Sequence, residues 1–181
     1  MQPKAFSMPS YSVFRKDLYH LCSWYQTEDT AQVSQFPGKE QGWVLLVEDS
    51  WHDLLLMSYV LDEQGLRGSV QYARSGKHAL KISRYGADHR EPQLNGMMID
   101  LSLPDMHGSE LVDVVRHDPF FEGLPVIVFS GSTTGLSERE RKSLKGAALA
   151  EKPIQFSQFQ ETFISLLHSL LEPGEFERAT A

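Results

Sequence analysis

The most informative part of this chain is Met-Met-Ile-Asp-Leu-Ser-Leu-Pro-Asp-Met-His-Gly, residues 97–108. A short apolar run ends in the carboxylate of Asp100 and then breaks at Pro104 and Gly108. A strand followed by a Pro/Gly turn presents its last polar side chain at the edge of a sheet. Three other apolar runs also end in polar residues: 44–47 before Glu48 and Asp49, 126–129 before Ser130, and 148–150 before Glu151 and Lys152.

From Trp43 onward, short apolar runs alternate with helix-like stretches, a pattern typical of a parallel sheet with crossover helices. We expect strands at 44–47, 69–73, 97–99, 126–129 and 148–150, and helices at 51–64, from Gly76 through Ile82, at 108–116, 137–144 and 156–170. Residues 86–95 read as a polar, irregular connection. The strand segments are almost continuously apolar, which predicts burial on both faces. The expected fold is therefore α/β, a doubly wound five-stranded parallel sheet of order 2-1-3-4-5.

Three segments are expected along the chain: an extension at 1–41, the α/β domain at 42–172 and a tail at 173–181. Apolar residues at helical spacing predict an amphipathic helix near 11–25, followed by a linker. Two interpretations of this extension remain open. It is either an arm packed on the domain or a contact surface for a dimer or another partner.

Composition narrows the functional classes. The chain has 181 residues, a formal net charge of -7 and a single cysteine, Cys22. An acidic chain has no bulk electrostatic attraction for nucleic acid, and one cysteine excludes an intramolecular disulfide. No apolar stretch approaches the roughly 20 residues that cross a bilayer. The expectation is a cytoplasmic protein with neither nucleic acid nor membrane as a partner.

The polar residues at the strand ends suggest a common site. In a doubly wound fold, Glu48, Asp49, Asp100, Ser130 and Lys152 would all lie in the crevice beyond the carboxyl ends of the strands. Taken singly, each has a simpler explanation, such as a helix cap or an exposed loop residue. Together, three carboxylates in one crevice repel one another unless a cation is present. Oxygen ligands favour a hard ion such as Mg²⁺, so the sequence predicts a metal-assisted phosphoryl-acceptor site.

Five motifs in order resemble the receiver domains of two-component response regulators (CheY-like, flavodoxin-like fold). They are LVEDS at 46–50, ARSGKHAL at 73–80, IDLSLPDMHG at 99–108, PVIVFSG at 125–131 and EKP at 151–153. The resemblance covers roughly residues 42–172. The approach to the third strand and the loop at 116–121 are also similar to small regulators paired with bacterial phytochrome kinases.

The resemblance implies that Asp100 is the phosphoacceptor, taking a phosphoryl group from a sensor histidine kinase, such as a bacteriophytochrome, or from a histidine phosphotransfer protein. It also implies Mg²⁺ as cofactor. Asp49 and Asp100 would bind the ion with the backbone carbonyl of Ser102, and Glu48 would act mainly through water. Such a protein is a switch in a phosphorelay and not an enzyme, apart from self-phosphorylation and autodephosphorylation.

Lys152 would pair with Asp100 at rest and with a phosphoryl oxygen afterwards, and Ser130 would hydrogen-bond that group. The resemblance further implies a cis peptide bond between Lys152 and Pro153. One position departs from the pattern. Many receivers carry Tyr or Phe three residues before the lysine, where this chain has Leu149, so the resemblance does not predict coupling through an aromatic ring here.

The expected role is a single-domain regulator that signals through altered protein contacts with an unknown downstream protein. The surface from Ser137 through Leu149 to Phe156 is where this family commonly dimerises, so a homodimer is a further expectation. Two alternatives remain. One is a Mg²⁺-dependent phosphohydrolase that works through an aspartyl phosphate, and the other is a phosphate-independent scaffold that keeps the fold.

Overall fold

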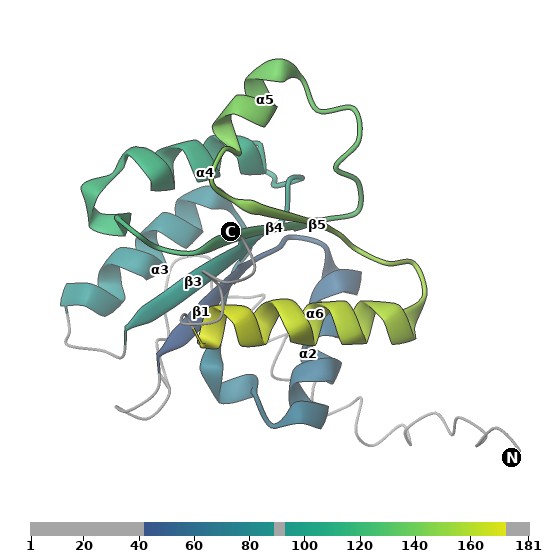
Figure 1. Ribbon diagram of the computed structural model, residues 1–181. Helices are drawn as coiled ribbons and strands as arrows, with labels where there is room; N and C mark the ends of the chain where they lie inside the picture. The colour runs from purple at the N-terminus through teal and green to yellow at the C-terminus, as the bar shows by residue number, and fades with distance from the viewer. Residues whose placement is uncertain (1–41, 89–92, 173–181) are drawn as a thin grey trace, which may run out of the picture. The chain divides into compact units, whose positions relative to one another are not determined.

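Five parallel strands form one sheet in the order β2-β1-β3-β4-β5 (Figure 1). The computed structural model describes residues 42–88 and 93–172, and the expected helix near 11–25, its linker and the tail lie outside these residues. The strands are β1 (Trp43–Val47), β2 (Val70–Ala73), β3 (Leu94–Ile99), β4 (Val126–Ser130) and β5 (Ala148–Glu151). The helices are α2 (Trp51–Gln64), η1 (Arg67–Ser69), α3 (Gly76–Asp88), α4 (Gly108–His117), η2 (Pro119–Phe121), α5 (Glu138–Ser143) and α6 (Phe156–Leu171).

Helices cover both faces of the sheet (Figure 1). Leu45 and Val47 of β1 face the core that includes α3 and α4. Val44 and Leu46 face the opposite core, to which α2 and α6 contribute. All five residues of β1 and all five of β4 are buried. The near-continuous apolar strands predicted this double burial, which holds for β1 and β4 but not for the edge strand β5, where every residue is at least partly exposed. The predicted fold class and strand order are confirmed.

Capping residues fix the bounds of the helices. The Ser50 side chain caps α2, and Gly65 ends the helix in the left-handed conformation at φ 67°, which glycine adopts without the steric cost of a Cβ. Ser137 and Glu140 form a capping box at the start of α5. The predicted helix at 51–64 is confirmed to the residue, and the last helix ends one residue later than expected.

Two further expectations are wrong. The connection between α3 and β3 is shorter than the predicted range 86–95, because α3 continues to Asp88 and β3 already begins at Leu94. The strand extends this far because Leu94 pairs with Trp43, whose N–H donates to the Gln93 carbonyl. The Lys152-Pro153 bond is trans, as is every peptide bond among the described residues. Trans is the form that an X–Pro bond ordinarily prefers.

None of the helices in the described part of the chain is both long and apolar enough to pass through a bilayer.

Candidate functional site

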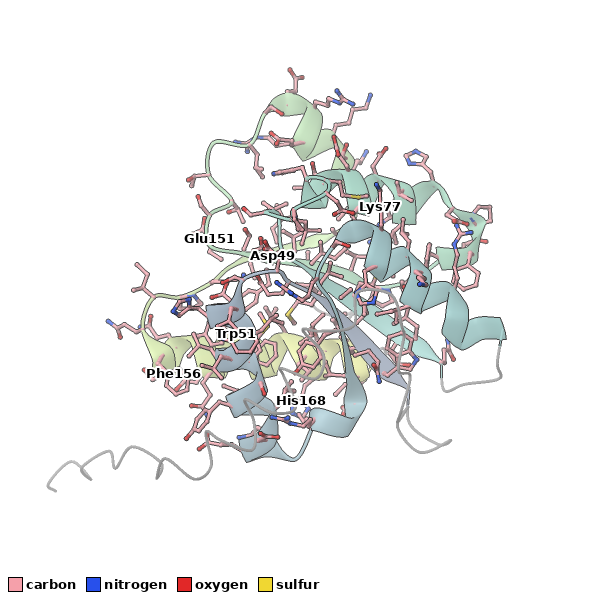
Figure 2. All side chains as sticks on the ribbon, turned by 180° about the vertical axis from the view of Figure 1, so that it is seen from behind. Asp49, Trp51, Lys77, Glu151, Phe156 and His168 are labelled. Carbon is pink, nitrogen blue, oxygen red and sulfur yellow. The ribbon has the colours of Figure 1, made fainter. Side chains whose placement is uncertain are left out.

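The polar residues that follow four of the strands meet at one edge of the sheet. Backbone hydrogen bonds hold neighbouring strand ends in register: the N–H of Asp100 donates to Val47 at 2.9 Å, and the N–H of Lys152 donates to Ser130 at 2.8 Å. Asp49 and Glu151 lie at this edge (Figure 2). A pocket of about 440 Å³ opens here, and all five predicted residues line it: Glu48, Asp49, Asp100, Ser130 and Lys152.

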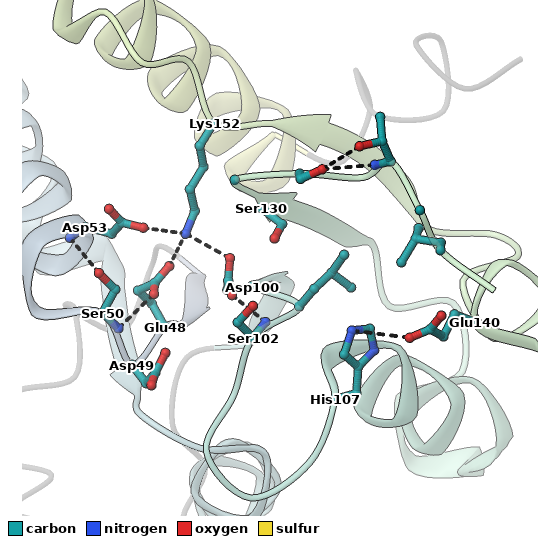
Figure 3. Close-up of a pocket in the computed structure, with 16 residues that line it drawn as sticks. Glu48, Asp49, Ser50, Asp53, Asp100, Ser102, His107, Ser130, Glu140 and Lys152 are labelled. Atoms are coloured by element: carbon teal, nitrogen blue, oxygen red, sulfur yellow. Dashed lines mark hydrogen bonds and ion pairs between the residues drawn. The ribbon is translucent and has the colours of Figure 1, made fainter.

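The ammonium of Lys152 is the centre of the site (Figure 3). Its Nζ donates to Asp100 Oδ1 at 2.9 Å, to Asp53 Oδ2 at 2.7 Å and to Glu48 Oε2. An ammonium has three N–H donors, so each has a carboxylate partner. The Lys152 side chain is 8% exposed, and such a buried cation is tolerable only because it is paired.

Burial and the ion pairs of the site shift the pKa values of Glu48 and Lys152. Burial raises the pKa of Glu48 from 4.5 to about 7, although Lys152 opposes this shift. Burial also disfavours the charged form of Lys152, but the carboxylates of Glu48 and Asp100 outweigh it and raise the pKa of the ammonium. Lys152 therefore stays charged, and Glu48 is protonated more readily than a glutamate in water.

The second oxygen of Asp100 is held by the turn after β3. Its Oδ2 accepts the backbone N–H of Ser102 at 2.5 Å, and the Gly108 N–H donates to the Leu101 carbonyl at 2.8 Å. A Cβ on Gly108 would lie 2.2 Å from the Asp100 carbonyl oxygen. The close approach of α4 to the strand end therefore requires glycine, and it fixes the direction in which Asp100 points.

The residues expected to bind a metal ion lie in the same pocket as the partners of Lys152. Asp49, Asp100 and Ser102 line the pocket. Within residues 42–88 and 93–172, no three acidic, histidine or cysteine side chains converge on a common metal position. Glu48 was expected to act mainly through water, yet it is 2% exposed and its carboxylate binds Lys152 and the Ser50 N–H.

The turn after β3 is also joined to the start of α3. Asp105 Oδ1 accepts the Gly76 N–H at 2.8 Å, and its Oδ2 accepts the Lys77 N–H at 2.9 Å. The carboxylate thus caps a helix that begins 29 residues earlier in the sequence. These N–H donors outweigh the effect of burial and lower the pKa of Asp105.

On the other side of the pocket, histidine links the same turn to α5. His107 caps α4 by accepting the Ser109 N–H on Nδ1, which requires that a neutral ring carries its proton on Nε2. That nitrogen faces Glu140 Oε1 at 3.5 Å. In the loop between β4 and α5, the hydroxyl of Ser132 forms a hydrogen bond of 2.8 Å with the hydroxyl of Thr134.

Sequence reasoning missed Asp53 and His107. Asp53 lies in the first turn of α2, where an acid is expected on capping grounds alone, and nothing in the sequence places it beside a lysine 99 residues away. His107 occupies an N-cap position, for which histidine has no particular preference. A buried cation, the carboxylate of Asp100 and a hydroxyl in one pocket together suit the binding of a phosphoryl group.

Comparison with known proteins gives the family. Residues 44–163 match the response regulator receiver domain. The probable methanogenesis regulatory protein FilR2 of Methanothrix harundinacea is 27% identical over 121 residues, which cover 66% of this chain and 77% of that protein. Response regulator Rcp1 of Synechocystis is 30% identical over 90 residues, which cover 49% of this chain and 61% of Rcp1.

Solved structures agree. The bacteriophytochrome response regulator AtBRR superposes with a TM-score of 0.56 at 30% identity, covering 71% of this chain and 94% of AtBRR. The Mn²⁺-bound form of Rcp1 has a TM-score of 0.60 at 23% identity, covers 72% of this chain and 95% of that one, and shows the shared fold. The match over residues 44–163 and the observed architecture show that this chain belongs to the response regulator receiver domain family.

Proposed function

We propose that this protein is a phosphorylation-dependent signalling switch in which Asp100 accepts a phosphoryl group. The observation that carries the proposal is the contact of Lys152 Nζ with Asp100 Oδ1 at 2.9 Å, inside a pocket that Ser130 also lines. Asp100 is 7% exposed, so incoming charge is met by a fixed cation in a partly dehydrated site, where its electrostatic effect is stronger than in water.

In the proposed reaction, a carboxylate oxygen of Asp100 attacks the phosphorus of a phosphohistidine on a partner protein. The new O–P bond forms as the P–N bond breaks, and the imidazole leaves with the electron pair. Lys152 stabilises charge on the phosphoryl oxygens, and the Ser130 hydroxyl donates to one of them. The Ser102 N–H holds the other oxygen of Asp100, so one oxygen is presented to the donor.

Mg²⁺ is the proposed cofactor. Asp49, Asp100 and the Ser102 carbonyl would hold it, with Glu48 nearby. Two carboxylates are enough, because Mg²⁺ usually keeps several waters and binds one or two carboxylates together with phosphate oxygens. When bound, the ion neutralises charge that develops on the phosphoryl oxygens. The Mn²⁺-bound form of the similar regulator Rcp1 supports this proposal.

The proposed donor is a sensor histidine kinase or a phosphotransfer protein. The similarity to the bacteriophytochrome response regulator AtBRR favours a kinase of the bacteriophytochrome class. The proposed readout is a changed protein contact at α5, β5 and α6, where Leu149 is 50% exposed, and a homodimer is one form that this contact could take. We further propose that the protein acts in the cytoplasm as a phosphoacceptor and carries no separate enzymatic activity.

Intact-mass measurement after treatment with acetyl phosphate and Mg²⁺ tests the chemistry. We expect wild type to gain the mass of one phosphoryl group, and Asp100→Asn to gain none. Asp113→Asn, which changes an exposed acid on α4, should behave like wild type. Phosphorylation that persists in Asp100→Asn would overturn the assignment, and steady multiple-turnover hydrolysis of phosphate esters would favour a phosphohydrolase instead.

A further inference from the structure

Asp53 is the partner of Lys152 that has no role in the proposed reaction. Its Oδ2 lies 2.7 Å from Lys152 Nζ, a distance typical of a strong charge-assisted hydrogen bond. The residue belongs to the first turn of α2, where its backbone N–H donates to the capping hydroxyl of Ser50 at 3.4 Å. The carboxylate therefore projects from a rigid, capped helix end and not from a mobile loop.

The other two partners of Lys152 change their interactions during phosphoryl transfer. Asp100 becomes the phosphorylated residue, and Glu48 lies near the proposed ion. Asp53 lines the same pocket but belongs to neither the acceptor nor the proposed metal ligands. It is the one of the three carboxylates whose hydrogen bond to the ammonium can persist throughout.

We propose that Asp53 is a positioning residue that keeps the ammonium of Lys152 aligned with Asp100 while the phosphoryl group is transferred. This inference rests on the proposed function. A lysine side chain is long and has many rotamers, so holding its charge in one place requires a fixed partner. Placing the charge before the reaction is the condition under which electrostatic stabilisation lowers a barrier.

Two other roles for Asp53 make different predictions. An acid in the first turn of a helix can simply stabilise that helix through its dipole. Alternatively, Asp53 could restrain Lys152 and draw it away from the incoming phosphoryl group. Loss of the side chain would leave the transfer rate unchanged in the first case and raise it in the second.

Two substitutions separate position from charge. Asp53→Ala and Asp53→Asn both remove one negative charge, so any electrostatic effect on Mg²⁺ affinity should be the same in both. Only Asn keeps an oxygen that can accept a hydrogen bond from Lys152. Gly65→Ala serves as the matched control. Gly65 has a positive φ, so alanine there destabilises the other end of α2, and its added Cβ would meet no atom within 4 Å.

The measurement is the rate of Asp100 phosphorylation by acetyl phosphate at saturating Mg²⁺, with a separate titration of the Mg²⁺ concentration that half-saturates the rate. For Asp53→Ala we expect the rate constant to fall by about tenfold or more. Asp53→Asn should recover part of that loss. The half-saturating Mg²⁺ concentrations of the two variants should agree within about twofold, and Gly65→Ala should react at the wild-type rate.

Equal rates in Asp53→Ala and wild type would overturn the inference, as would a faster rate in the variant. Equal losses in the Ala and Asn variants would also overturn it, because the lost charge would then be sufficient to explain the effect. If wild type reacts normally, each of these outcomes leaves the proposed function intact. A wild-type protein that takes no phosphoryl group would overturn the proposed function and this inference with it.

Discussion

Thr133 donates both its backbone N–H and its hydroxyl to one carboxylate oxygen of Glu151, at 3.1 and 2.8 Å. Thr133 belongs to the loop between β4 and α5, and Glu151 ends β5 directly before Lys152. These two hydrogen bonds lower the pKa of Glu151. The loop beside the pocket is therefore attached to the strand that directly precedes Lys152.

Removing the Glu151 carboxylate should release this loop. In Glu151→Ala, we expect the amide proton of Thr133 to exchange with solvent about tenfold faster than in wild type, because its acceptor is lost. Amide protons within β4 should keep their protection. Glu138→Ala, which removes another exposed acid from the start of α5, is the control. Equal exchange at Thr133 in all three proteins, measured by NMR, would contradict this role of Glu151.

Asp105 should stabilise the domain through the start of α3. The cost of losing a helix cap is about 1 kcal/mol, and we expect Asp105→Ala to lower the free energy of unfolding by this amount in urea titrations near neutral pH. Because the pKa of Asp105 is lowered in the fold, its contribution is present above the unfolded-state pKa and is lost as pH falls through the folded-state value.

Asp113→Ala is the matched control for Asp105, since Asp113 is an exposed acid on α4. Its substitution should change the free energy of unfolding by less than about 0.5 kcal/mol. If both variants were equally stable, the hydrogen bonds from Gly76 and Lys77 would not act as a cap.

A side chain at position 108 should disturb the acceptor. In Gly108→Ala, the new Cβ would lie 2.2 Å from the Asp100 carbonyl oxygen and 2.8 Å from Leu101 Cα. Both are backbone atoms and cannot rotate away, so we expect the free energy of unfolding to fall by about 1–3 kcal/mol and the rate of Asp100 phosphorylation to fall as well. Gly68→Ala meets no atom within 4 Å and should leave both quantities nearly unchanged.

The fold could be predicted from the sequence because β1, β4 and the second half of β3 are apolar runs, and polar residues stand at or directly after the ends of four strands. The site residues at the strand ends followed from that topology, since parallel strands bring their carboxyl ends to one edge. The hydrogen bonds within the pocket did not follow. Glu48 and Asp53 turn toward Lys152 because a buried ammonium needs three acceptors, and this requirement becomes visible only when the lysine is known to be buried.

The last prediction concerns pH. The pKa of Glu48 rises from 4.5 to about 7 on folding, so between these values the folded state binds more protons than the unfolded state. Glu48 therefore makes its whole contribution to the free energy of unfolding when the pH is below its unfolded-state pKa of 4.5. This contribution is lost as the pH rises through the folded-state pKa of about 7. The loss is on the order of 3 kcal/mol. Gln at this position cannot titrate.

We therefore expect Glu48→Gln to gain stability relative to wild type as pH rises from about 5 to about 8. Urea unfolding with EDTA present checks this, because bound Mg²⁺ would favour the ionised carboxylate and hide the effect. If the Glu48→Gln difference did not change with pH, the Glu48 carboxyl group would titrate alike in the folded and unfolded states, and its burial would not control the charge of the site at rest.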